Sequence, residues 1–288
     1  TKSDLSSVLV DYTFSGNVDS KLTSSIKVGG AIAAGKANSN KVIFDKQPTS
    51  SEDPVVGISL GANKSQPLYN ATATFSAINF SHSDSEGESI RLFGRDFVVS
   101  TATDFSDLVL FKSAQEISLT AGGSSPSPSA TVTIDGTAYT VELVTGSGTT
   151  SATINVNGEQ KTVNSGASKK INGLEVAVKT ITESTALSTI DATLLIGSEK
   201  LTLTDGTKVK VGSDDDPIDG TEVQLVGHGT GATTEITVSV FAPRTNNDAL
   251  LEGESFVDPV FGSFQLQLTG LNQPLDSTDR ETVVISNS

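Results

Sequence analysis

The sequence of 288 residues contains no cysteine, methionine or tryptophan. Without cysteine there is no disulfide framework, no thiolate nucleophile and no cysteine-ligated zinc. No apolar run reaches the roughly 18 residues that a membrane-spanning helix needs, so the sequence predicts no membrane span. Aromatic residues make up only 5% of the chain, which leaves few flat platforms for stacking sugars or bases.

Basic residues are scarce as well. The formal net charge is -15, and a chain of this charge repels phosphates at long range, so nucleic acid is excluded as a partner. Charged residues make up 18% of the sequence, below the usual quarter or so. Serine and threonine take the exposed positions instead, which is typical of secreted β-rich proteins. We therefore expect an extracellular protein at the cell surface.

Helical periodicity is weak throughout, and its best candidates are short helices at residues 21–26 and 102–105. Alternating apolar runs separated by turn residues are abundant instead. Pairs of Asn-Gly or Asp-Gly between such runs predict two-residue type I′ hairpin turns, in which both central residues take positive φ. These pairs are Asp135-Gly136, Asn157-Gly158, Asn172-Gly173 and Asp205-Gly206. The pattern predicts an all-β chain of tandem or nested Ig-like β-sandwich domains with many tight hairpins.

Two stretches of turn-forming residues divide the chain. The first is a Gly/Ser/Pro linker at residues 121–129, and the second is an acidic loop that follows residue 212. We predict that residues 130–212 form a sandwich domain inserted into an outer domain made of residues 1–120 and 213–288. Three domains in series are the alternative. The insertion is preferred because the residues after 212 alone would bury only a small core.

The two histidines do not suggest catalysis. His82 lies between Ser81 and Asp84 in one loop, whereas a catalytic triad needs groups that converge from separate elements. His228 lies in a glycine loop that precedes a strand, and a phosphate-binding loop would precede a helix. A hydrolase with paired carboxylates would need two of them across one cleft. The sequence therefore predicts a protein that is not an enzyme.

Acidic side chains form the strongest candidate site. Four carboxylates lie beside turn-forming Pro and Gly, those of Asp214, Asp215, Asp216 and Asp219. Ca²⁺ takes about six to eight oxygen ligands from such loops, so calcium is the candidate cation. The spacing differs from that of an EF-hand, and a solvated acidic turn is the alternative interpretation. A weaker acidic set comprises Glu252, Glu254 and Asp258.

Sequons for N-glycosylation begin at Asn63, Asn70 and Asn79. Chance alone accounts for their number in a chain so rich in Ser and Thr. Their clustering in one segment predicts a glycan-bearing face in a secreted protein.

Four segments, taken in their order along the chain, resemble archaeal S-layer proteins. They are residues 89–99, 133–143, 170–178 and 256–264. The resemblance implies Ig-like β domains that assemble into a two-dimensional lattice or a related surface filament. Subunits of this family are usually larger than this chain and carry a membrane or wall anchor, and no anchor is visible in this sequence. We therefore expect a filament subunit or a fragment, in preference to a subunit of a planar lattice.

The two ends of the chain are candidates for assembly. Residues 8–14 alternate, which would place Val8, Val10, Tyr12 and Phe14 on one face, and residues 282–285 form a last strand. A terminal strand either pairs within its own sheet or completes the sheet of a neighbouring copy. The leading hypothesis is a structural protein that polymerises with itself, and the alternative is a secreted Ig-like adhesin or binding module.

Overall fold

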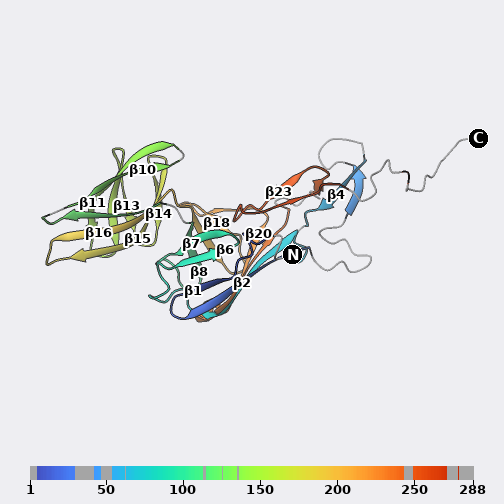
Figure 1. Ribbon diagram of the computed structural model, residues 1–288, viewed down its shortest axis with the longest axis horizontal. Coiled ribbons are helices and arrows are strands. Elements are labelled where there is room, and N and C mark those ends of the chain that lie inside the picture. The colour runs from blue at the N-terminus through green and yellow to red at the C-terminus, as the bar shows by residue number, and fades with distance from the viewer. Residues whose placement is uncertain are drawn as a thin grey trace, which may run out of the picture.

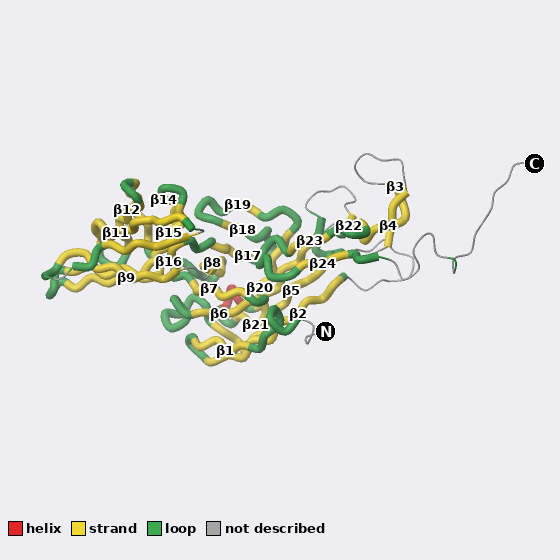
Figure 2. The backbone as a smooth tube through the Cα atoms, turned by 45° about the horizontal axis from the view of Figure 1, so that its top comes forward, coloured by secondary structure: helices red, strands yellow, loops and turns green. Residues whose placement is uncertain are grey.

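The computed structural model describes residues 5–29, 42–46, 54–61, 63–112, 115–124, 126–134, 136–242, 249–270 and 278. These residues form twenty-four strands and one short 3-10 helix, η1 (His228–Thr230). The strands pair into several sheets (Figures 1 and 2). The predicted all-β sandwich class is confirmed. The predicted helix at residues 21–26 is wrong, because these residues lie in a strand whose side chains alternate between buried and exposed. The predicted helix at residues 102–105 is also wrong, because these residues form an irregular connection before β8.

Two large sheets form the first sandwich, here called sandwich one. The five-stranded sheet has the order β1-β2-β5-β21-β20, and the six-stranded sheet has the order β19-β18-β17-β8-β7-β6. The bounds in the first sheet are β1 (Tyr12–Ser15), β2 (Asp19–Val28), β5 (Tyr69–Ile78), β20 (Thr221–Val226) and β21 (Thr233–Val240). Those in the second are β6 (Ser89–Leu92), β7 (Arg95–Val99), β8 (Asp107–Lys112), β17 (Lys200–Thr204), β18 (Lys210–Val211) and β19 (Asp216–Pro217). Alternate side chains of both sheets meet in one apolar core.

Sandwich two lies at one end of the molecule (Figure 1). Its sheets have the orders β10-β11-β12-β13 and β14-β15-β16-β9. The bounds are β9 (Gln115–Gly122), β10 (Ser129–Ile134), β11 (Thr137–Ser147), β12 (Ser151–Val156), β13 (Glu159–Asn164), β14 (Ser168–Ile171), β15 (Leu174–Ser184) and β16 (Thr189–Ile196). Most strands in these two sheets pair with the strand that precedes or follows them in sequence, as in a β-meander. The described strands of sandwich two contain no Greek-key connection. A second apolar core fills the space between the two sheets.

Two smaller sheets lie at the opposite end from sandwich two (Figures 1 and 2). A three-stranded sheet has the order β22-β4-β3, with β3 (Val42–Lys46), β4 (Pro54–Ser59) and β22 (Ala249–Leu251). A hairpin joins β23 (Ser255–Val257) to β24 (Gln265–Gln267). The predicted last strand at residues 282–285 lies outside the described residues.

The strand pairing sets the limits of the two sandwiches differently from the predicted domain boundaries. β9 pairs with β16 along its length, and Thr120 pairs with Ser127 inside the predicted linker. The Gly/Ser/Pro segment therefore connects two strands of sandwich two and does not separate domains. β17 pairs with β8, so the chain has returned to sandwich one by Lys200. The Gly/Ser/Pro composition of residues 121–129 predicts a loop, but it does not determine to which sheets the flanking strands belong.

Two of the predicted hairpin turns have the expected backbone. Asn157 and Gly158 have φ values of 47° and 100°, and Asn172 and Gly173 have values of 47° and 80°. Each pair connects strands separated by two residues, as a type I′ turn requires. These two predictions are confirmed.

The other two pairs differ. Asp135 lies outside the described residues. Asp205 is not among the residues with positive φ, and its Oδ1 accepts a hydrogen bond of 2.8 Å from the backbone N of Leu225. The type I′ prediction is therefore wrong there, because a tertiary contact with β20 determines the conformation. Residues 89–99 were also predicted as two short strands around a glycine turn, and this prediction is confirmed: Phe93 and Gly94 connect β6 to β7, and both have positive φ.

Replacing Gly158 with alanine tests the turn geometry. A side chain at φ near 100° is strained, so Gly158→Ala should lower the free energy of unfolding by about 1–2 kcal/mol. Gly229 is the matched control, because it does not lie in the left-handed region; Gly229→Ala should leave stability unchanged or raise it by up to about 1 kcal/mol. Urea unfolding measures both. Equal losses in the two variants would contradict the assignment.

Candidate functional site

A small apolar cluster joins the two sandwiches. Val98 and Phe111 are cross-strand partners on β7 and β8, and Ala177 and Leu195 are cross-strand partners on β15 and β16. The four side chains pack together as one cluster, and none is more than 5% exposed. The outer face of one sheet of sandwich one thus packs against the outer face of one sheet of sandwich two.

The sequence carried a signal for this junction. Strands β7, β8, β15 and β16 each contain three or four consecutive buried residues. Alternate residues of these runs face their own sandwich core, and one residue of each run, Val98, Phe111, Ala177 or Leu195, faces the other sandwich. A strand that is covered on both faces shows a continuous apolar run instead of alternation. In an antiparallel protein, such a run therefore indicates that another part of the protein covers the outer face of the sheet.

Polar contacts flank the apolar cluster. The Ser100 hydroxyl donates to the carbonyl of Gly166 at 2.6 Å, and the hydroxyls of Thr101 and Ser165 lie 3.4 Å apart. Gly166 has a φ of 74°, and a Cβ at this position would lie 2.3 Å from Thr101 Oγ1 and 2.5 Å from the backbone N of Ala102. Only glycine permits the two backbones to approach this closely.

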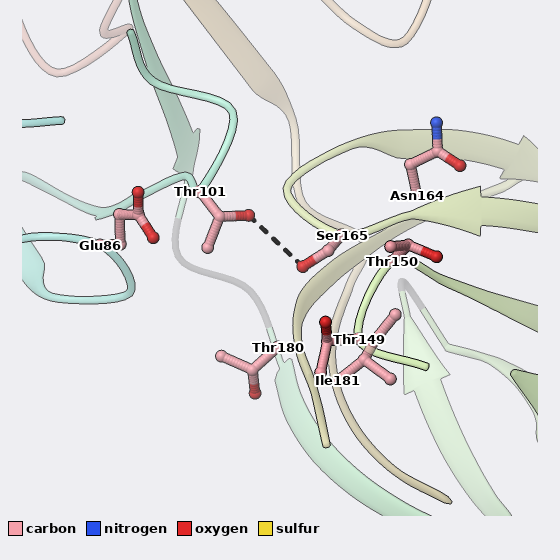
Figure 3. Close-up of a pocket in the computed structure, with 8 residues that line it drawn as sticks. All are labelled: Glu86, Thr101, Thr149, Thr150, Asn164, Ser165, Thr180 and Ile181. Carbon is pink, nitrogen blue, oxygen red and sulfur yellow. Dashed lines mark hydrogen bonds between the residues drawn. The ribbon is translucent and has the colours of Figure 1, made fainter. Parts of the chain in front are cut away.

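A hollow of about 580 Å³ opens beside this contact (Figure 3). Its walls come from both sandwiches: Glu86, Thr101, Thr149, Thr150, Asn164, Ser165, Thr180 and Ile181. All of these side chains except that of Ile181 are polar. Partial burial raises the pKa of the Glu86 carboxyl, and the nearby His82 acts in the opposite direction. No local sequence pattern indicates these residues as a group, because they lie in separate loops and strands.

The structure does not gather the carboxylates of the predicted calcium loop. Asp215 Oδ2 lies 2.8 Å from Lys200 Nζ, and Asp215 Oδ1 accepts a hydrogen bond of 2.9 Å from Thr202 Oγ1. Partial burial acts to raise the pKa of Asp215, but the hydrogen bonds from Lys200 and Thr202 outweigh it and the pKa is lowered. This carboxylate therefore fastens its loop to β17.

The remaining acidic residues of the loop point elsewhere. Asp219 lies 2.6 Å from Lys208 Nζ, and this partner lowers the pKa of Asp219. Asp214 and Asp216 are exposed. Within the described ranges, no group of three or more His, Asp or Glu side chains is arranged to hold a metal ion. The geometry corresponds to the alternative, an acidic turn, here paired in part with lysines.

Asp258, from the weaker acidic set, is buried instead of solvated. It is 2% exposed, and its carboxylate accepts hydrogen bonds from the Tyr69 hydroxyl and from the backbone N of Phe261 and Gly262. Burial raises the pKa of Asp258 despite these donors. Arg95 donates to the carbonyls of Phe261 and Gly262. These contacts anchor the segment between β23 and β24 to sandwich one.

The three sequons differ in exposure. Asn63 is exposed. Asn70 lies in β5, inside the five-stranded sheet, and its Oδ1 is buried without a hydrogen-bond partner among the described residues. Asn79 is half-buried, and its Oδ1 accepts hydrogen bonds from the backbone N and the hydroxyl of Ser81. Asn63 is the most accessible of the three for a glycan.

The N-terminal strand belongs to its own sheet. β1 pairs with β2 from Tyr12 onward, while the residues before it form a turn, so the strand is shorter than predicted. Phe14 and Val8 are buried in the core of sandwich one, and Val10 is half-buried. The Tyr12 hydroxyl donates to the carbonyl of Ser89 at 3.0 Å. Of the two alternatives for this strand, the structure has pairing within the chain's own sheet.

The histidines take no part in a triad-like arrangement. His82 Nδ1 accepts a hydrogen bond of 3.1 Å from the backbone N of Asp84, in its own loop. His228 is 4% exposed, its Nδ1 lies 3.1 Å from Thr233 Oγ1, and its Nε2 is buried without a partner among the described residues. Burial lowers the pKa of His228, while the nearby Asp107 and Asp104 oppose this shift. His228 is therefore an internal packing residue.

No protein-family model matches the chain, and no curated protein matches it. No helix among the described residues is both long enough and apolar enough to cross a membrane.

Replacing Gly166 with alanine tests the close approach at the junction. The added Cβ would meet the backbone of Ala102, so Gly166→Ala should loosen the junction and lower the free energy of unfolding by more than about 2 kcal/mol. Gly173→Ala is the matched control, because Gly173 also has positive φ but nothing lies within 4 Å of its Cβ position. Gly173→Ala should lower the free energy of unfolding by only about 1–2 kcal/mol, which is the cost of placing a side chain at positive φ. Small-angle scattering of both variants should show a change in shape for Gly166→Ala only; two identical profiles would contradict the role of the junction.

Acid should destabilise sandwich one through His228. The unfolded chain binds a proton at this residue near its usual pKa of about 6.5, and the folded chain does so only at lower pH because burial lowers the pKa. The unfolded state therefore binds more protons below pH ~6.5, and stability falls as the pH falls through this window. Urea unfolding at pH 7.5 and 5.5 should show a smaller difference for His228→Gln than for the wild type. An unchanged difference would show that another group is responsible.

Proposed function

We propose that this chain is a structural subunit of an extracellular surface layer or filament that assembles from many copies of itself. The observation that carries the proposal is the junction of Val98 and Phe111 with Ala177 and Leu195. An ordered array repeats the same contacts only if each subunit presents them in a fixed relative orientation. A buried contact between two sandwiches provides this orientation.

The path of the chain adds to the rigidity. It passes from sandwich one to sandwich two between β8 and β9, and it returns between β16 and β17. Two connections restrict rotation more than the single linker of domains in series. The resemblance to archaeal S-layer proteins and the acidic surface rich in Ser and Thr agree with an extracellular structural role.

Assembly needs strand edges or faces that the subunit does not use itself. Because β1 pairs with β2 of its own chain and Phe14 lies in the core of its own sandwich, we do not propose that the N-terminal strand is donated to a neighbouring copy. The strands β3 and β22 form the two edges of the three-stranded sheet, at the end of the molecule away from sandwich two (Figure 2). Edge strands offer backbone donors and acceptors to a neighbouring chain, so this sheet is the preferred location for a contact between copies.

A binding module remains the second candidate function. The observation that favours it is the polar hollow between the sandwiches, since ligand sites often lie where two domains meet.

Negative-stain electron microscopy tests the structural proposal with the same glycine variants. The wild-type protein and Gly173→Ala should form regular lattices or fibres on concentration. Gly166→Ala should give shorter or disordered assemblies, because its two sandwiches no longer keep one orientation. Analytical ultracentrifugation of the same samples gives the mass distribution.

Two results would argue against the proposal. Monodisperse wild-type monomers over the whole concentration range would move the assignment to a binding module. Equally ordered assemblies from Gly166→Ala, once scattering has shown that its junction is altered, would mean that rigidity at the junction is not required.

A further inference from the structure

We infer that two lysines, Lys161 and Lys169, keep one open side of sandwich two from pairing with the same strands of a second copy. The two residues are here called the lysine clasp. The inference concerns unwanted association, so it does not require that the chain assembles into a layer or filament. It rests on the position of β13 and β14 at sheet edges and on the hydrogen bonds that cross between them.

β13 and β14 are edge strands that follow one another in sequence. β13 ends the sheet β10-β11-β12-β13, and β14 begins the sheet β14-β15-β16-β9. Neither strand has a second strand partner within the described ranges, and the two lie beside each other on one side of the sandwich. An edge strand leaves a row of backbone N–H and C=O groups unpaired, and a strand of another molecule can pair with that row.

Each lysine of the clasp donates to a backbone carbonyl of the opposite edge strand. Lys161 Nζ, from β13, donates to the carbonyl of Lys170 on β14 at 2.7 Å. Lys169 Nζ, from β14, donates to the carbonyl of Thr162 on β13 at 2.8 Å. Each edge therefore has one acceptor occupied and one ammonium group placed beside it. A second strand could approach only after these charged groups move away, and lysine is a residue by which natural edge strands avoid pairing.

Glu159 and Asn172 reinforce the clasp. Glu159 Oε1 lies 3.0 Å from Lys161 Nζ, and Glu159 Oε2 accepts a hydrogen bond of 2.7 Å from the backbone N of Asn172. Hydrogen bonds from Lys161 and Asn172 lower the pKa of the Glu159 carboxyl, so it stays charged at neutral pH. This carboxylate holds Lys161 beside the edge and ties the turn between β14 and β15 to β13.

The other side of sandwich two is closed by backbone groups instead. Thr120 and Ser127 exchange two backbone hydrogen bonds of 3.0 Å between the ends of β9 and β10. No backbone ladder joins β13 to β14 in the described part of the chain. Lysine side chains take the place of such a ladder, so substitution can remove the protection of this side without altering the backbone.

Sedimentation velocity of full-length double variants tests the inference. Lys161→Gln/Lys169→Gln removes the clasp. Lys64→Gln/Lys208→Gln is the matched control, because each of its lysines pairs with a carboxylate at 2.6 Å. Both variants remove two positive charges from a chain of net charge -15, so electrostatic repulsion alone would reduce association equally in both. The clasp variant should instead self-associate at least about tenfold more tightly than the control, since its edges gain backbone hydrogen bonds to a second copy.

Amide hydrogen exchange locates the contact between copies. In the oligomers of the clasp variant, exchange should slow at residues 160–164 and 168–170 relative to the monomeric control, because these amides gain a strand partner. Lys161→Arg/Lys169→Arg should stay as monomeric as the control, since arginine also donates from a long, charged side chain. Thermal melting checks that each variant is folded, and Lys169→Gln alone replaces the double variant if the latter unfolds.

Three results would overturn the inference. They are a folded clasp variant that associates no more than the control, slowed exchange that maps outside β13 and β14, and an arginine variant that associates as strongly as the glutamine variant. Wild-type monomers in electron microscopy would count against the proposed assembly, but they would leave this comparison intact, because it is made at concentrations where the wild type is monomeric. The two proposals can therefore fail separately.

Discussion

The contact between two outer sheet faces is the interaction on which the arrangement of this protein depends. Val98 and Phe111 face away from the core of sandwich one, where water would otherwise meet them, and Ala177 and Leu195 cover them. Burying apolar area stabilises by roughly 25 cal/mol for each Å² removed from water. The same contact brings Gly166 against the opposite backbone and forms the hollow beside it, so the candidate ligand site exists only because the sandwiches meet.

Carboxylates have different partners at the surface and in the interior. On the surface, Asp215 and Asp219 pair with lysines, which uses two of the carboxylates that the sequence pattern suggested for calcium. Inside, Asp258 accepts hydrogen bonds from neutral donors, and it anchors the C-terminal hairpin. These three acidic residues thus hold a loop and a hairpin to sandwich one.

Predictions from the sequence succeeded where the physical cause was local. The turns at Asn157-Gly158 and Asn172-Gly173 follow from the ability of these residues to take positive φ, which needs no distant partner. The prediction at Asp205 failed because its side chain bonds to β20. The Gly/Ser/Pro segment was a loop, as predicted, but pairing of Thr120 with Ser127 places it inside sandwich two. The hollow was not predictable, since its lining comes from segments far apart in the sequence.

The sequence by itself determined the all-β class and two tight Asn-Gly turns, because alternation of apolar residues and positive φ are properties of neighbouring residues. Only the tertiary structure decided which strands share a sheet, which outer faces meet and what each carboxylate binds. Val98 and Leu195 lie in one apolar cluster although almost a hundred positions of chain separate them. Such a contact depends on the shapes of two folded sheets. Continuous apolar runs in the sequence indicate that both faces of a strand are covered, but they do not indicate which part of the chain covers the outer face.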